Sequence, residues 1–168
     1  MESFLILLEQ SSLPAWIREG GTLTGYPLVL FLHTLGLSVL VGLSVALDFR
    51  LLGFAPGIPL RALVRAYPVM WAGFALNATT GALLFAADAT RHFSNPAFFV
   101  KLVCVAFAIV CLVLLRNVVF REHSADAGPV DEGRVGMRGK VLAASSLGAW
   151  FVAIVAARLM AYINEFIQ

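Results

Sequence analysis

Charged side chains are scarce in this chain. Asp, Glu, Lys and Arg make up 13% of its 168 residues, whereas 60% of the residues are hydrophobic and the mean hydropathy is +0.89. A soluble domain of this size exposes a large share of its surface to water and cannot conceal so much apolar surface. The composition therefore excludes an ordinary soluble domain and indicates a chain surrounded by lipid.

Residues that commonly bind metals are also few. The chain has three His, two Cys and four Met, and the Met residues are scattered, without the Met-rich motif typical of Cu(I) sites. Cys104 and Cys111 lie on one expected helix with their Cα atoms roughly 10 Å apart, too far for a disulfide. No phosphate-binding loop and no Ser–His–Asp set is present, so hydrolase and nucleotide-binding signatures are lacking.

Four long apolar segments approach the length of about 20 residues that a membrane-spanning helix needs. None of them alternates between apolar and polar residues as a barrel strand does. We therefore predict an all-α fold, a four-transmembrane-helix bundle that occupies residues 21–168 as one domain. The expected spans are about 27–47, 67–87, 97–115 and 141–163.

Lys and Arg are unequally divided between the two sides of this predicted bundle. Eight of the twelve lie in the connections between the first and second and between the third and fourth spans. Cytoplasmic loops carry an excess of Lys and Arg, so we predict an N-out/C-out, multi-pass protein of the bacterial inner membrane. The net charge of +2 then reflects topology, with lipid and not nucleic acid as the partner.

Residues 1–20 form a separate N-terminal segment. The start, MESFLILLEQ, is acidic where a signal peptide is basic, and its apolar run is short. Trp16 and Arg18 suit the lipid headgroup region. We expect residues 3–19 to form one or two interfacial helices on the outer face.

Each expected span carries one ionisable residue near its outer end: His33, Asp88, Lys101 and Arg158. An ionisable residue inside a span is costly and indicates function by default. His33 lies roughly 10 Å below the outer surface and is too short to reach the headgroups, as Lys101 and Arg158 can. The alternative is a neutral His33 that is hydrogen-bonded to a neighbouring Asn, Ser or carbonyl.

A b-type haem is the first ligand that these residues suggest. It needs one or two axial ligands from helices, an apolar slot and cations near its propionates. His33 is then the axial ligand, and Lys101 and Arg158, with Arg91 as a third candidate, meet the propionates.

The second axial ligand is less defined. His123 lies on the opposite side of the membrane from His33, which leaves His92, just after the second span, or Met160 on the fourth. With three His in the chain, a second haem with two His ligands is excluded by count. We therefore expect one haem at most.

Small and polar residues recur every four positions on the second span, at Gly73, Asn77 and Gly81. This spacing allows close approach of a flat ligand, such as the haem ring, or of a neighbouring helix, and helix packing is the commoner explanation. Asn77 lies near the middle of the membrane and needs a partner. At the inner ends, we expect Asp48 to join an ion-pair network with Arg50 and other arginines.

Other ligands and roles stay open. A quinone carbonyl could accept hydrogen bonds from His33, Lys101 and Arg158, with Asp88 in a proton relay. A second class of function is a cofactor-free accessory subunit of a larger membrane complex, and copper transport or handling is a third.

Two stretches, YPLVLFLHTLGLSVLVGLSVALDFRLLG and AGFALNATTGALLFAADATRHFSNPAFFVKL, resemble a bacterial inner-membrane family that has a domain of unknown function. The shared features are a His in the first span, an LDxRLLG helix end, a GFxLxxxTGxLLF span and an NPxFxxK start of the third span. That family is distantly similar to copper-resistance D-type membrane proteins and to small four-helix cytochromes b. The resemblance implies haem or copper and assigns no residue a role.

These observations lead to one functional expectation. The chain is expected to be a membrane electron-transfer protein that binds one b-type haem in the outer half of the bundle. It would exchange electrons with quinol or with a periplasmic redox partner. Electron transfer alone needs no general acid or base, so no catalytic residue is nominated.

Overall fold

The computed structural model describes residues 2–19, 24–124 and 136–166, and within these ranges the regular elements are all α-helices. The predicted all-α fold is therefore confirmed. In chain order the helices are α1 (Glu2–Glu9), α2 (Ser12–Glu19), α3 (Tyr26–Leu52), α4 (Leu60–Arg65), α5 (Tyr67–Ala87), α6 (Ala89–Phe93), α7 (Pro96–Ser124) and α8 (Met137–Phe166).

Four of these helices, α3, α5, α7 and α8, are long and apolar enough to cross a membrane, and together they indicate a multi-pass membrane protein. Each expected span falls within one of them. The helix α7 continues to Ser124, beyond the expected end near residue 115. Its last turns contain no Gly or Pro, so nothing in their sequence stops the helix where the apolar residues end.

The ends of the spanning helices follow Pro and Gly. The helices α3 and α5 each have a Pro in the first turn, where the missing N–H costs nothing. The helix α3 stops at Gly53, which has φ +92° and donates its backbone N–H to the carbonyl of Arg50. Only glycine adopts this left-handed conformation without strain, and it is a common helix terminator.

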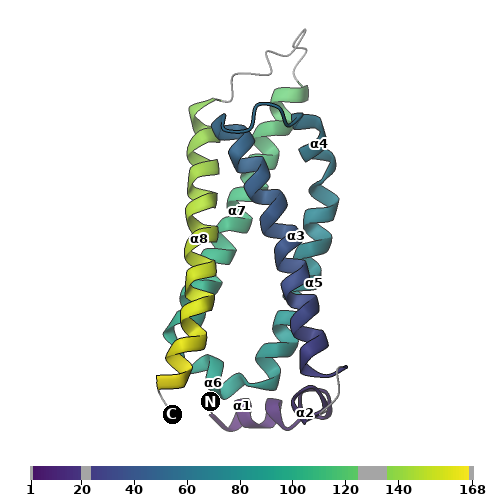
Figure 1. The fold of residues 1–168 in the computed structure, drawn as a ribbon, viewed down its shortest axis with the longest axis vertical. Coiled ribbons are helices and arrows are strands. Elements are labelled where there is room, and N and C mark those ends of the chain that lie inside the picture. The colour runs from purple at the N-terminus through teal and green to yellow at the C-terminus, as the bar shows by residue number, and fades with distance from the viewer. Residues whose placement is uncertain (1, 20–23, 125–135, 167–168) are drawn as a thin grey trace.

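The spanning helices form two antiparallel pairs, α3 with α5 and α7 with α8, and the pairs meet mainly through α3 and α8 (Figure 1). The helices α1, α2 and α6 and the end of α8 gather at one end of the bundle, which we call the α1–α2 end. The helix α4 lies at the opposite end, which we call the α4 end. The two ends of the described chain therefore lie at the same end of the bundle, as the predicted four-span topology requires.

The main apolar core occupies the half of the bundle nearer the α4 end. It is formed by twelve buried residues from five helices: Leu40, Leu47, Leu51, Leu63, Tyr67, Met70, Ala108, Leu112, Leu115, Ala143, Ala149 and Trp150. A smaller cluster of Ile17, Val29 and Ala87 packs α2 against α3 and α5 at the α1–α2 end. The core that joins the two helix pairs thus lies away from His33.

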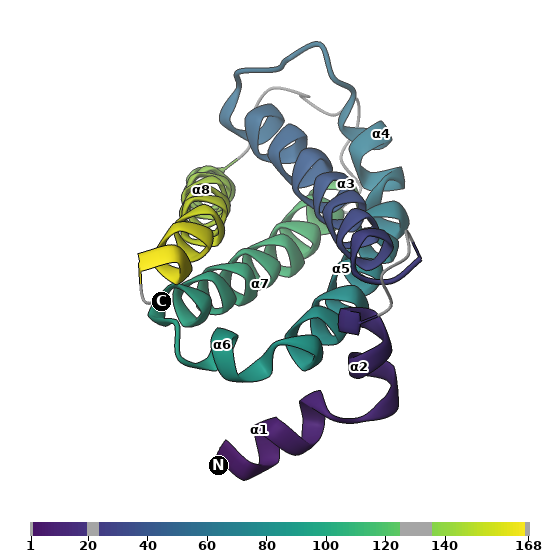
Figure 2. The ribbon, with the colours of Figure 1, turned by 60° about the horizontal axis from the view of Figure 1, so that its bottom comes forward.

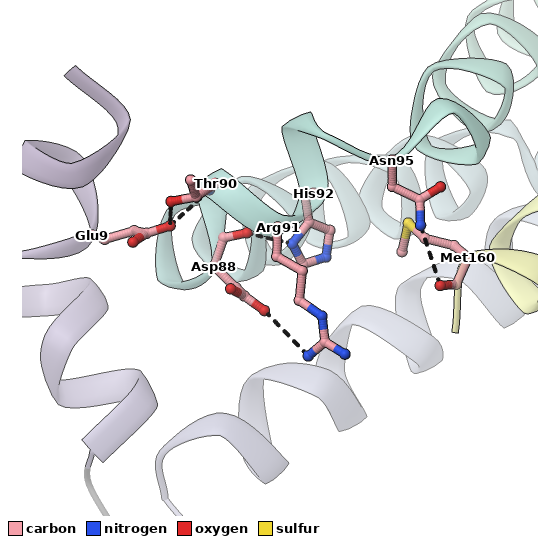
Figure 3. Close-up of polar contacts among 7 residues, drawn as sticks. All are labelled: Glu9, Asp88, Thr90, Arg91, His92, Asn95 and Met160. Atoms are coloured by element: carbon pink, nitrogen blue, oxygen red, sulfur yellow. Dashed lines mark hydrogen bonds and ion pairs between the residues drawn. The ribbon is translucent and has the colours of Figure 1, made fainter. Parts of the chain in front are cut away.

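The N-terminal segment forms two helices that lie across the α1–α2 end, as Figure 2 shows from below. The carboxylate of Glu9 accepts a hydrogen bond of 2.7 Å from the backbone N–H of Thr90 and a second from the Thr90 hydroxyl (Figure 3). A first-turn N–H of α6 has no partner within its own helix, so Glu9 supplies one. This contact fixes α1 to α6, and a position at the membrane interface stays a prediction.

Candidate functional site

His33 lies on the face of α3 that packs against α5, and its side chain is half-buried. Its Nδ1 is 3.0 Å from the backbone carbonyl oxygen of Asn77 and 3.2 Å from the hydroxyl of Thr80. Both partners belong to α5, one turn or less apart. The alternative that we left open, a histidine hydrogen-bonded to neighbouring polar groups, is therefore present in the structure.

These partners assign the tautomer of His33. A backbone carbonyl only accepts hydrogen bonds, and the Thr80 hydroxyl donates its own hydrogen to the carbonyl of Leu76 at 2.6 Å. Both groups can therefore only accept from Nδ1, so Nδ1 carries the hydrogen. In a neutral imidazole the other nitrogen, Nε2, then keeps its lone pair.

Asn77 also contacts His33 through its side chain. The amide Nδ2 donates a hydrogen bond of 2.9 Å to the backbone carbonyl of His33 and lies 3.3 and 3.4 Å from the two ring nitrogens. Asn77 and His33 thus each supply the polar partner that the other needs inside the bundle. This mutual contact locks the rotation of α3 relative to α5.

Glycines bring the two helices together. A Cβ added to Gly36 would lie 2.8 Å from backbone atoms of Gly73 and Asn77, and one added to Gly73 would lie 3.0 Å from the carbonyl oxygen of Gly36. A Cβ on Gly81 would lie 3.0 Å from Cε1 of His33. The space next to Gly73 and Gly81 is therefore filled by α3 and by the imidazole.

Lys101 approaches the site from α7. That helix begins at Pro96, and the side chain of Asn95 accepts a hydrogen bond of 3.0 Å from the N–H of Ala97. Lys101 is half-buried and close enough to His33 for its charge to act on the imidazole. Within residues 2–19, 24–124 and 136–166, no hydrogen bond or ion pair occupies its ammonium group. The structure thus brings His33, Asn77 and Gly81 into contact, and the charge of Lys101 acts on His33 from α7.

The two arginines predicted to meet propionates lie at the surface. Arg158 is exposed, with its guanidinium 5.8 Å from the centre of the Tyr162 ring, a distance that suits a cation–π interaction. Arg91 pairs with Asp88 at 3.8 Å, and both side chains are more than 40% exposed (Figure 3). The contacts of these arginines are those of surface residues near helix ends.

The two candidates for a second axial ligand have other contacts. His92 belongs to α6, where its Nδ1 is 2.7 Å from the carbonyl of Asp88 and its ring packs against Phe85 and Phe98. Met160 lies beside Asn95, whose Nδ2 donates to the Met160 carbonyl at 3.4 Å (Figure 3). In the described part of the chain, no group of three or more His, Cys, Asp and Glu is placed to hold a metal ion.

The expectation for Asp48 was wrong. Asp48 is 1% exposed, and Ser146 of α8 donates a hydrogen bond to its carboxyl group. No ion pair involves Asp48 within the described ranges. The side chain points into the bundle because Leu47, Asp48 and Leu51 together face the core, while Arg50 turns away and donates to the carbonyl of Ile58 at 2.7 Å. Thr80 was not among the predicted site residues. It follows Asn77 by three residues and directly precedes Gly81, and this position on the same helix face was the available signal.

Cys104 and Cys111 are free thiols, as their spacing on one helix predicted. Comparison of the chain with protein-family models, with curated proteins and with solved structures gave no match. A functional assignment therefore depends on the arrangement around His33. That arrangement offers one imidazole lone pair, on Nε2 and 3.4 Å from the Asn77 side-chain amide, and one half-buried ammonium group on α7.

Proposed function

We propose that the chain is an integral membrane electron-transfer protein of the bacterial inner membrane that binds one b-type haem through His33. One observation carries the proposal: Nδ1 of His33 donates to a backbone carbonyl, so Nε2 keeps the lone pair that a metal needs. Histidines that bind metals usually donate their other ring N–H to a carbonyl or carboxylate, which fixes the ring and raises its basicity.

The residues around His33 fit such a group. His33 would hold the haem through Nε2, and the Lys101 ammonium would pair with a propionate. Because the core that joins the helix pairs lies toward the α4 end, a ring beside His33 leaves that core in place. When bound, haem supplies one-electron oxidation and reduction.

The chain's own residues have separate parts in this proposal. Asn77 and Thr80 hold the imidazole in one orientation, and Gly81 gives the ring room against α5. Apolar residues of the spans keep water away. His33 is the one protein ligand that we assign, while His92 and Met160 stay predictions for the opposite side of the iron.

The proposed orientation puts His33 near the outer surface. The distribution of Lys and Arg favours an outward-facing α1–α2 end, which contains α1, α2 and the end of α8. A quinol or a periplasmic redox protein would then be the electron partner. A reporter fused after α8 should report an outer location, and a reporter inserted between α7 and α8 a cytoplasmic one.

Absorption spectra test the haem directly. The chain would be expressed with added haem, purified in detergent and measured after air oxidation and after dithionite reduction. We expect a Soret band that shifts on reduction, that is lost in His33→Ala and that persists in His123→Ala. A colourless protein from haem-replete cells, or a His33→Ala variant with an unchanged spectrum, would overturn the assignment.

The second candidate function is a cofactor-free accessory subunit of a larger membrane complex. It is favoured by the hydrogen bonds of His33, which Asn77 and Thr80 satisfy without any ligand. In that case His33 serves the contact between α3 and α5. The protein should then be colourless and should copurify in a stable complex. A variant in which the α3–α5 contact is destabilised should no longer join that complex.

A further inference from the structure

A second polar cluster lies in the half of the bundle nearer the α4 end. Asp48 and Ser44 of α3 and Ser146 and Trp150 of α8 are each 1% exposed. Ser146 donates a hydrogen bond to the Asp48 carboxyl and so joins the two helices. A carboxyl group at this depth in a spanning helix is rare and indicates a function of its own.

The four residues occupy two successive levels of the bundle. Ser44 precedes Asp48 by four residues on α3, and Trp150 follows Ser146 by four residues on α8. Residues four apart lie on one helix face, about 6 Å apart along the axis. Because α3 and α8 are antiparallel, Ser44 and Trp150 both lie one turn from the Asp48–Ser146 contact, toward the α1–α2 end.

Three atoms of this cluster share one property. Asp48 Oδ2, Ser44 Oγ and Trp150 Nε1 are buried and make no hydrogen bond within the described part of the chain. Leaving such a group unsatisfied costs about 1–3 kcal/mol. A buried water molecule typically makes about three hydrogen bonds to groups of this kind. A single water that satisfied all three atoms would accept from the Trp150 indole and bridge to Ser44 and Asp48.

The surroundings do not neutralise an ionised Asp48. Tyr67 of α5 and Cys111 of α7 face Asp48 closely enough to feel its charge, and Arg116 acts on Tyr67. The carboxyl group is without an ion pair among the described residues and has one hydroxyl donor, Ser146. Burying a carboxylate with so little compensation is expensive, whereas a bound proton removes the charge.

We propose that Asp48 is a proton-binding site inside the bundle. It takes one proton from the aqueous phase and becomes a carboxylic acid. Ser146 and an internal water held by Ser44 and Trp150 complete its hydrogen bonds. When the proton leaves, the carboxylate returns and its charge acts on Tyr67 and Cys111. The site is about 22 Å from His33 along α3, so it does not depend on a haem.

Infrared spectroscopy tests this site in the purified chain in lipid nanodiscs. At neutral to mildly acidic pH we expect the C=O stretching band of a buried protonated carboxyl group, with a shift in D2O. The band should disappear in Asp48→Asn and persist in Asp88→Asn, whose parent carboxylate is exposed. Absence of the band from the wild type, or its survival in Asp48→Asn, would overturn the proposal.

Two further variants keep the test decisive. Ser146→Ala removes the hydroxyl donor, so the band should shift in frequency even if Asp48→Asn fails to fold; an unshifted band contradicts the site. Trp150→Phe removes one partner of the water. An O–H band that is sensitive to oxygen-18 water should be present in the wild type and lost in this variant, and its absence or persistence contradicts the internal water.

Discussion

Asn77 holds His33 through both its main chain and its side chain. The Asn77 carbonyl oxygen lies 3.0 Å from His33 Nδ1, and Asn77 Nδ2 donates at 2.9 Å to the His33 carbonyl. Two intramembrane polar residues thus satisfy each other across the contact between α3 and α5. The same contact leaves the lone pair of the His33 ring on Nε2, which lies 3.4 Å from the side-chain amide of Asn77.

The coupling between His33 and Asn77 is the first prediction. A double-mutant cycle with His33→Ala and Asn77→Ala should give a coupling energy of roughly 0.5 kcal/mol, because both replacements remove the side chain–side chain contacts of 3.3 and 3.4 Å, whereas each main-chain contact is lost in one variant and kept in the other. Unfolding in mixed micelles measures it. Ser38→Ala is the control, since the Ser38 hydroxyl bonds only to the Thr34 carbonyl of its own helix. Its combination with Asn77→Ala should be additive, and additivity in the first cycle would contradict the contact.

Two glycines of α3 form a matched pair for the second prediction. Gly36→Ala places a Cβ 2.8 Å from backbone atoms of α5, which cannot move aside as a side chain can, whereas Gly42 has nothing within 4 Å. Gly36→Ala should lower the free energy of unfolding by about 2–3 kcal/mol. Gly42→Ala should leave it unchanged or raise it by up to about 1 kcal/mol. Equal effects in the same unfolding titration would contradict this packing.

Lys101 provides a third prediction, which depends on the proposed haem. Lys101→Met should keep the Soret band but raise the haem dissociation rate about tenfold, because a charged hydrogen bond contributes about 1.5–3 kcal/mol. Arg158→Gln should change the rate less, since the guanidinium is exposed over Tyr162. Haem transfer to apomyoglobin measures both rates. A larger effect of Arg158→Gln than of Lys101→Met would indicate that the propionate contacts Arg158 of α8.

Glu9 gives a pH dependence. Hydrogen bonds from the Thr90 hydroxyl and N–H lower the pKa of Glu9 below its usual 4.5, with a smaller contribution from the charge of Arg18. A lowered folded-state pKa means that the ionised carboxylate stabilises the contact above the ordinary pKa and that this stabilisation is lost as the pH falls through the folded value. Acidification should therefore lower the protection of the α1 and α6 amides against hydrogen exchange, once the rates are corrected for the slower intrinsic exchange at low pH.

Glu9→Gln should show faster exchange already at neutral pH and lose the dependence on acid. Thr90→Val keeps the backbone N–H but removes the hydroxyl, so its effect should be intermediate. If Glu9→Gln retained the acid dependence of the wild type, the titrating group would be a different one.

Asn95 is the fifth prediction. It is 1% exposed, accepts a hydrogen bond from Ala97 N–H at the start of α7 and donates one to the Met160 carbonyl. Loss of a helix N-cap costs about 1 kcal/mol. Asn95→Ala should lower the free energy of unfolding by at least that amount. Ser94→Ala removes an exposed hydroxyl that donates to the Thr90 carbonyl of α6, and it should have little effect.

The sequence alone determined the class of fold and the positions of the spans. Inside lipid every backbone N–H and C=O must be satisfied within its own segment, so a long apolar run has few structures other than a helix. The helices α3, α5 and α7 begin within one residue of the predicted starts, whereas α3 and α7 continue beyond the predicted ends at 47 and 115. The predicted ends followed the apolar residues, but a helix continues until a residue such as Gly53 stops it.

The tertiary structure decided which faces meet. A periodicity of 3.6 residues places Gly73, Asn77 and Gly81 on one face, but it does not specify whether a ligand or a helix covers that face. In the folded bundle the helix α3 covers that face of α5, and His33 lies against it. The surroundings of Asp48 could not be predicted from sequence for the same reason. Its hydrogen-bond partner Ser146 lies on the last spanning helix, and only the folded bundle reveals that the carboxyl group is buried in the interior.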